Sequence, residues 1–269
     1  MKLTIVLAKT MFAVTLAGML FTSKALADTG PCAANTGGPL PDLIVDRAVL
    51  AQYLSVADEK LAKASCAVQE GFVSGPGVHA LLRFTSSTPN IGAGALVIGN
   101  PALCPSLFFE QSTCHGHLHF REYADYRFWT LQGYDTWLAR RDLTMPTGTG
   151  VNAAALAEAA KNRSLIVGRK MGFCMYDIVT YTAPTSSAPV FISCAVQGLS
   201  PGWADRYDSR LDGQYIEADT LKAGDYVLEV HVNPEQLLPE TDYTNNSSAI
   251  KVRYFPKRAS TPATIEVIN

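Results

Sequence analysis

The chain has 269 residues and a formal net charge of −2, and 48% of its residues are hydrophobic. This charge balance excludes the strongly basic surface that nucleic-acid binding requires. The length and the apolar content are sufficient for one large domain with a sizeable core.

The first 27 residues have the features of a secretory signal peptide. They combine lysines near the start, an apolar run from Met11 to Phe21, and the small-x-small sequence Ala25-Leu26-Ala27. The run is shorter than the roughly 20 residues of a transmembrane helix, and no other stretch has the length and apolarity for a span. We therefore expect a secreted or periplasmic protein with a signal peptide over 1–27, a flexible leader over 28–40, one domain over 41–258 and a tail over 259–269.

Short apolar or alternating runs between Gly, Pro and Asn clusters predict β-strands. In chain order the expected strands are Pro41–Asp46, Ala80–Phe84, Ala95–Ile98, a histidine-containing strand continuing to Leu131, one or two within Leu165–Tyr181, Asp225–Val232 and Ala249–Phe255. Helical spacing is found in Val56–Glu70 and in the alanine-rich Val151–Lys161, with Asn152 as its expected N-cap. We expect Tyr134–Thr149 to be less regular. This pattern predicts a mainly β fold, an antiparallel β-sandwich-like single domain with a few short helices.

Three of the five histidines lie together, at His115, His117 and His119. On a β-strand this spacing places all three imidazoles on one face, because successive side chains alternate sides. Three converging imidazoles with open positions favour Cu(II) or Zn(II). A solvated histidine-rich strand without metal is the alternative.

All six cysteines follow the expected cleavage site, and an even number in an exported chain predicts disulfides. They are Cys32, Cys66, Cys104, Cys114, Cys174 and Cys194. Cys114 is adjacent to His115, so it is either a thiolate metal ligand or, as we expect in an oxidising compartment, part of a disulfide that tethers the histidine strand.

Several segments together resemble the lysyl oxidase family in the same order along the chain. The run Cys114–His119 resembles the family's copper segment, Cys-His-x-His-x-His. The other matching segments are Leu40–Asp46, Ala80–Phe84, Gly168–Cys174, Gln197–Gly202, Asp205–Tyr207 and Val232–Asn246. The resemblance extends from about residue 40 to 255, and seven matches in order make it specific.

The resemblance implies a copper-dependent amine oxidase whose cofactor, lysine tyrosylquinone, forms from its own side chains. It assigns the cofactor lysine to Lys170, the tyrosine to Tyr207, and the copper ligands to His115, His117 and His119. Primary amines and O₂ would be the substrates, with aldehyde, ammonia and hydrogen peroxide as products. It also implies a disulfide between Cys114 and Cys194. The connectivity of Cys32, Cys66, Cys104 and Cys174 stays open.

Some assignments have rivals within the sequence. Asp205 is the expected catalytic base, with Asp212 and Glu122 as alternatives. Tyr215 is the alternative tyrosine, eight residues after Tyr207. The segment between the histidines and Lys170 is longer than in the animal members of the family, which leaves the choice of amine open. A copper-binding β-sandwich module without oxidase activity, and a zinc-binding or adhesive sandwich, are the alternative functions.

Overall fold

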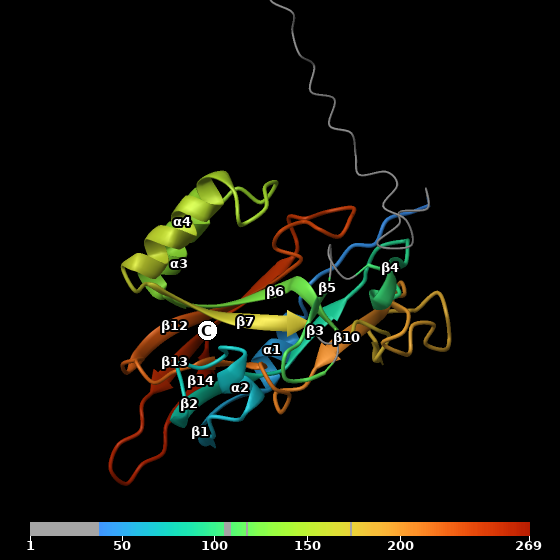
Figure 1. Ribbon diagram of the computed structural model, residues 1–269. Coiled ribbons are helices and arrows are strands. Elements are labelled where there is room, and N and C mark those ends of the chain that lie inside the picture. The colour runs from blue at the N-terminus through green and yellow to red at the C-terminus, as the bar shows by residue number, and fades with distance from the viewer. Residues whose placement is uncertain (1–37, 105–108, 117, 173) are drawn as a thin grey trace, which may run out of the picture.

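A computed structural model describes residues 38–104, 109–116, 118–172 and 174–269 (Figure 1). The predicted signal peptide, most of the leader, and His117 lie outside the described residues. The helices are α1 (Arg47–Gln52), α2 (Cys66–Gln69), the 3-10 helix η1 (Pro101–Leu103), α3 (Leu131–Arg140) and α4 (Gly150–Lys161). The strands are β1 (Leu54–Leu61), β2 (Gly77–Phe84), β3 (Ser86–Pro89), β4 (Leu96–Gly99), β5 (Phe109–Gln111), β6 (Leu118–Thr130), β7 (Leu165–Gly172), β8 (Val179–Thr180), β9 (Gln197–Leu199), β10 (Trp203–Tyr207), β11 (Tyr215–Glu217), β12 (Gly224–Val232), β13 (Ser247–Phe255) and β14 (Thr264–Ile268).

The longest strand, β6, is central to the largest sheet. Within the described residues this sheet runs β14-β13-β12-β6-β5, and β7 also pairs with β6. All of these pairings are antiparallel. The register between β6 and β7 shifts between Phe120 and Ala124, and Glu122 at this bulge has a φ of 50°. A bulge bends a strand and re-aims its side chains, and here it separates the histidine end of β6 from the remainder of the strand.

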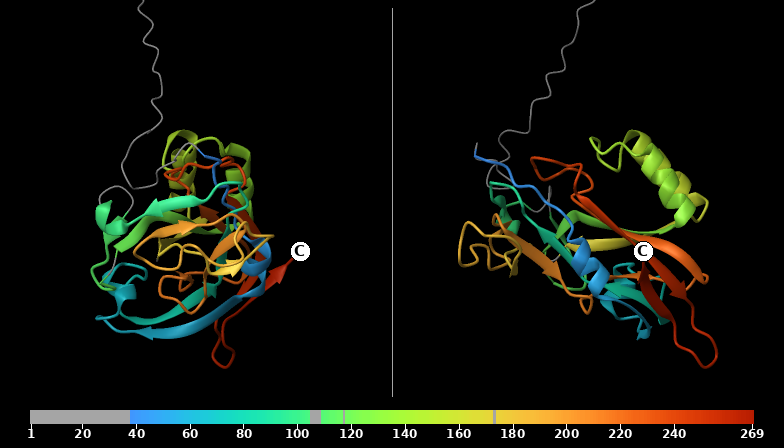
Figure 2. Two further views of the ribbon diagram at one scale, coloured as in Figure 1. Left: turned by 90° about the vertical axis from the view of Figure 1, so that its right-hand side faces the viewer. Right: turned by 180° about the vertical axis from the view of Figure 1, so that it is seen from behind.

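Smaller antiparallel sheets pack against one face of the large sheet (Figure 2). In the part of the chain that the structure describes, they are β1-β2-β11, β3-β10-β8 and β4-β9. The main core is shared between the layers, because Phe84 of β2, Tyr126 of β6 and Leu228 of β12 are buried in one cluster. The predicted mainly β, antiparallel sandwich-like fold is confirmed.

Two helices cover the other face of the large sheet. Figures 1 and 2 show α3 and α4 side by side beyond the start of β7, away from its arrowhead. Trp137 of α3 stacks on Trp129 of β6 with 5.7 Å between the ring centroids. Glu229 of β12, almost fully buried, accepts a hydrogen bond from Trp129 Nε1 at 2.9 Å and lies 3.6 Å from the buried Arg127. These contacts fix the long segment between the histidines and Lys170 onto the sheet.

Some local predictions are wrong. Val56–Glu70 is not one helix: β1 pairs with β2 from Leu54 to Leu61, and only Cys66–Gln69 is helical. Pro41–Asp46 forms an isolated bridge between Leu43 and Asn90 instead of a strand. The helix predicted over Val151–Lys161 is present as α4, but its N-cap is Thr149.

Two further segments are more regular than expected. Helix α3 occupies part of the segment expected to be irregular, because the Thr130 side chain accepts a hydrogen bond from Gly133 N and caps it. Residues 264–268, within the expected tail, form β14 on the edge of the large sheet.

Candidate functional site

The first group of candidate residues lies where the chain enters β6. His119, the second residue of β6, is buried, and His115 lies in the bend before the strand. The prediction that these histidines share one strand face is therefore wrong. Gly116, with a φ of 72°, turns the chain between them, a conformation that favours glycine. The two rings still converge, with centroids 5.3 Å apart.

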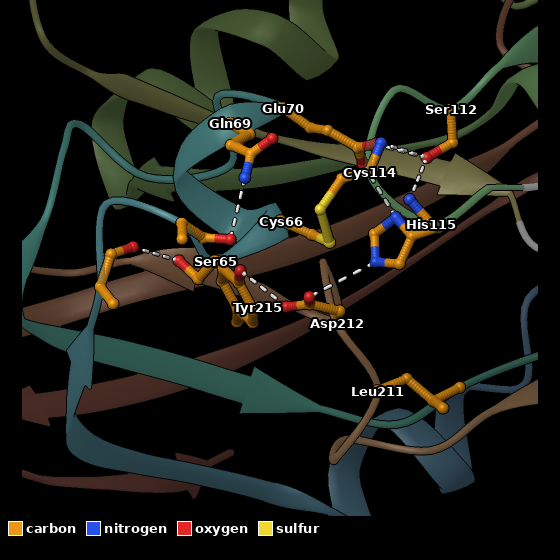
Figure 3. Close-up of polar contacts among 12 residues, drawn as sticks. Ser65, Cys66, Gln69, Glu70, Ser112, Cys114, His115, Leu211, Asp212 and Tyr215 are labelled. Atoms are coloured by element: carbon orange, nitrogen blue, oxygen red, sulfur yellow. Dashed lines mark hydrogen bonds and ion pairs between the residues drawn. A yellow bond between two sulfur atoms is a disulfide. The ribbon is translucent and has the colours of Figure 1, made fainter.

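A buried carboxylate supports this histidine pair. Glu70 follows α2, and its side chain, 6% exposed, faces His115 (Figure 3). Its Oε1 accepts hydrogen bonds from the Ser112 hydroxyl and from Cys114 N at 3.1 Å, and its Oε2 lies 3.0 Å from His115 Nδ1. Burial alone would raise the pKa of Glu70, but these hydrogen bonds and the charges of His115 and His119 lower it overall. Glu70 is therefore ionised at neutral pH.

A second carboxylate lies on the opposite side of the His115 ring. Asp212 Oδ2 is 3.5 Å from His115 Nε2, and the hydroxyl of Tyr215 donates a hydrogen bond to Asp212 Oδ1 at 3.3 Å. Figure 3 shows that the loop carrying Leu211 and Asp212 passes below the imidazole. Asp212, one of the two alternative bases, and Tyr215, the alternative tyrosine, therefore both lie beside the histidine pair.

The disulfides differ from the expected pairing. Cys114 is bonded to Cys66, and Cys194 is bonded to Cys174, so the predicted Cys114–Cys194 bond is wrong. Cys104 is also disulfide-bonded. The Cys66–Cys114 bond ties α2, and with it Glu70, to the histidine segment. It also removes Cys114 from the possible metal ligands, because a disulfide sulfur is no thiolate.

The second group of candidate residues lies on β10. Asp205 and Tyr207 are both buried and stand two residues apart on this strand, opposite Thr88 and Ser86 of β3. The Tyr207 ring meets the ring of Tyr123 from β6 edge-on, with 5.4 Å between centroids. The Tyr123 hydroxyl donates a hydrogen bond to Thr88 Oγ1 at 2.6 Å. Thus β6 contacts β10 directly at the predicted quinone tyrosine.

The electrostatics of this group keep its phenols protonated. Burial, followed by the negative charge of Asp205, raises the pKa of Tyr207 well above its usual value. The same two effects raise the pKa of Tyr123. A fully buried carboxylate among tyrosines is unusual, because burial disfavours the charged form of a carboxyl group. Perturbed groups gathered in this way are typical of functional sites.

Lys170 lies on the neighbouring strand β7. Its backbone pairs with Ala124 of β6, which follows Tyr123 directly. The side chain of Lys170 lies outside the described part of the chain. Its position along β7 brings the second predicted cofactor residue to the segment of β6 that contacts Tyr207, just beyond the bulge.

A cavity of about 320 Å³ opens beside the second group. Asp205, Tyr207 and Leu211 line it together with the Cys174–Cys194 disulfide. Leu211 precedes Asp212, which faces His115, so one short loop borders both the cavity and the histidine group. The remaining alternative base, Glu122, is exposed at the bulge of β6.

The chain is similar to known proteins over most of its length. Residues 156–263 match the family model described as Lysyl oxidase. Protein-lysine 6-oxidase from Homo sapiens is 28% identical over 226 residues, which cover 80% of this chain and 46% of the human protein. The Sus scrofa protein-lysine 6-oxidase is 27% identical over 80% of this chain and 77% of its own length. Lysyl oxidase homolog 1 from Bos taurus is 26% identical, over 84% of this chain and 34% of its own.

The resemblance to the lysyl oxidase family is confirmed. These matches also support the prediction of a lysyl-oxidase-like enzyme. The segment that matches the lysyl oxidase family model contains Lys170, Asp205 and Tyr207, and it begins after the histidine run. The chain spans about half the length of the human relative. No helix among the described residues is long and apolar enough to cross a membrane.

The described residues fit a copper ion at the histidine group. Glu70, His115 and His119 offer ligand atoms that all lie within 4.8 Å of one another. Imidazole nitrogens suit Cu(II) and Zn(II), and with Cys114 in a disulfide the available donors are nitrogen and oxygen. His115 and His119, with His117 between them in the sequence, are the residues that would hold the metal.

Proposed function

We propose that the chain is an exported, copper-dependent amine oxidase. It converts primary amines, lysine side chains of proteins or small amines, to aldehydes. In each turnover the amine, O₂ and water give the aldehyde, ammonia and hydrogen peroxide. The amine carbon loses two electrons, and O₂ takes them up as peroxide.

The observation that carries this proposal is the arrangement along β6. This strand bears His119 near its start, contacts Tyr207 through Tyr123, and pairs with Lys170 through Ala124. The proposed metal site and the two residues of the proposed crosslink are thus all next to β6. The match of residues 156–263 to the lysyl oxidase family supports the same assignment.

Each candidate residue has a physical role in this proposal. His115, His117 and His119 hold copper, and Lys170 and Tyr207 supply lysine tyrosylquinone, which accepts the electrons of the amine. Asp205, buried beside Tyr207 and lining the cavity, takes the proton from the amine carbon. Burial keeps bulk water from this carboxylate, so proton transfer takes place between positioned groups.

Two disulfide bonds support export of the chain. The bonds Cys66–Cys114 and Cys174–Cys194 belong to an oxidising compartment. The signal-peptide features of residues 1–27 point the same way.

Amine-dependent peroxide release by the copper-loaded chain tests the function. Lys170→Ala and Tyr207→Phe should each abolish peroxide release, and Tyr207→Phe should also remove quinone staining, while circular dichroism stays unchanged. Tyr215→Phe is the matched control, because Tyr215 is also buried and hydrogen-bonded to an aspartate. This variant should retain quinone staining.

The opposite results have clear meanings. Full activity in Tyr207→Phe would refute the assignment of Tyr207, and loss of staining in Tyr215→Phe alone would transfer the role to Tyr215. Stoichiometric copper without peroxide from any primary amine would instead support a copper-binding module without oxidase activity.

A further inference from the structure

We infer that Glu70 is the positioning residue for His115: it accepts the Nδ1–H hydrogen bond and leaves Nε2 as the metal-binding nitrogen. This inference rests on the metal site of the proposed function and adds a residue that the sequence pattern does not contain.

The contacts of the His115 ring distinguish its two nitrogens. Glu70 Oε2 lies 3.0 Å from Nδ1, a hydrogen-bond distance, so Glu70 occupies this nitrogen. Nε2 lies on the opposite side of the ring, 3.5 Å from Asp212 Oδ2. Nε2 is therefore the nitrogen that remains for a metal.

Glu70 is itself held in place by its surroundings. Its other oxygen accepts from the Ser112 hydroxyl and from Cys114 N. Ser112 Oγ in turn accepts a hydrogen bond from His115 N at 2.7 Å. The Cys66–Cys114 disulfide joins the helix preceding Glu70 to the residue preceding His115 (Figure 3). The ring therefore has little freedom to turn about its side-chain bonds.

This arrangement has the chemistry of a carboxylate that supports a metal-bound histidine. Such outer partners orient the ring and raise its basicity, and their removal typically weakens metal binding by about 10–100-fold. The Glu70 side chain is 6% exposed, and its other oxygen already accepts hydrogen bonds from neutral donors. Both facts favour a role in supporting His115 over a role as a metal ligand.

Metal affinity of the full-length chain tests the inference. Competition titrations with a chelator should show Cu(II) and Zn(II) bound about 10–100-fold more weakly by Glu70→Ala. Glu70→Gln should recover part of the loss, because its amide oxygen still accepts from Nδ1–H. Glu158→Ala is the control: Glu158 is an exposed residue of α4 that pairs with Arg140 of α3, on the helices behind the large sheet. Its metal affinity should equal that of the unaltered chain.

A spectroscopic measurement on the unaltered chain keeps the inference testable should Glu70→Ala fail to fold. Nitrogen-15 NMR of the zinc-loaded protein should show His115 protonated on Nδ1 and metal-bound through Nε2. Coordination through Nδ1 overturns the inference, as does an affinity of Glu70→Ala within twofold of the unaltered chain. A loss in Glu70→Gln as large as in Glu70→Ala makes Glu70 a direct ligand instead.

The results that would refute the proposed oxidase differ from those that would refute the role of Glu70. A chain that binds copper tightly, shows the Glu70 dependence and releases no peroxide refutes the oxidase and leaves the positioning role intact. An unaltered chain that binds neither metal refutes both.

Discussion

Asp205 is the residue on which the proposed proton transfer depends. It is fully buried, it lies two residues before Tyr207 on β10, and it lines the cavity beside the tyrosine. Asn has nearly the same shape but accepts no proton at neutral pH. Asp205→Asn should therefore lower kcat for amine oxidation by about 10²–10⁴-fold, the usual contribution of a positioned base. Steady-state peroxide kinetics measure this loss.

The control for Asp205 comes from the rival base on β6. Glu122 is exposed at the bulge, so Glu122→Gln should leave kcat within about threefold of the unaltered chain. Copper content should be unchanged in both variants. A kcat for Asp205→Asn equal to that of the unaltered chain would remove Asp205 from the mechanism and leave Asp212, beside His115, as the remaining candidate.

Some of the site could be predicted from residues alone, and some could not. The scarcity and spacing of the histidines indicated a metal site, and His115 and His119 do converge. His115 and His119 do not share one strand face, because Gly116 turns the chain before β6 begins. Glu70 carried no local signal, since it reaches His115 only through a tertiary contact and a disulfide that spacing does not determine.

At the scale of elements, the Cys66–Cys114 bond should contribute to both stability and metal binding. It closes a loop with a sequence separation of 48 residues, which corresponds to at most about 4 kcal/mol in the chain-entropy model. The paired change Cys66→Ser with Cys114→Ser should lower the free energy of unfolding by up to this amount and weaken copper binding, because α2 and Glu70 lose their tether. Urea unfolding and copper titration measure the two effects.

The second disulfide is the comparison for the first. Cys174–Cys194 spans 20 residues, and its removal should cost at most about 3 kcal/mol while leaving copper affinity unchanged. Equal loss of copper affinity in both double variants would contradict a specific role for the Cys66–Cys114 bond. Non-reducing peptide mapping should recover both pairs, and a Cys114–Cys194 peptide would contradict the structure.

The success of local prediction differed between elements for physical reasons. The alanine-rich segment formed α4 as expected, because helix propensity and packing against α3 and β7 agree. Val56–Leu61 has apolar residues at helical spacing but pairs with β2 along its whole length. Pairing with a distant strand outweighed that spacing, and strand preference depends strongly on such context.

At the scale of the whole molecule, the buried tyrosines should limit stability at alkaline pH. The pKa values of Tyr123, Tyr126 and Tyr207 are all raised, first by burial and in each case also by the charge of Asp205. The folded chain holds these protons more tightly than the unfolded chain does. Their stabilising contribution is therefore present below about pH 10 and is lost as the pH rises further.

The free energy of unfolding of the copper-free chain should accordingly fall above pH 10. Three retained protons alone correspond to about 4 kcal/mol per pH unit. The raised pKa values of other tyrosines, Tyr134 and Tyr215 among them, add to this slope. Urea unfolding between pH 9 and 11.5 measures the slope, and Tyr126→Phe should reduce it by about 1.4 kcal/mol per pH unit, because one buried phenol is removed. A slope near zero above pH 10 would show that these phenols ionise without unfolding the chain.

The most direct test of the proposed oxidase is peptide mass spectrometry of the chain after copper loading in air. We predict one crosslinked peptide pair joining Lys170 to Tyr207, absent when copper is withheld and absent in Tyr207→Phe. Recovery of Lys170 and Tyr207 in separate, unmodified peptides from the copper-loaded chain would contradict the proposed cofactor.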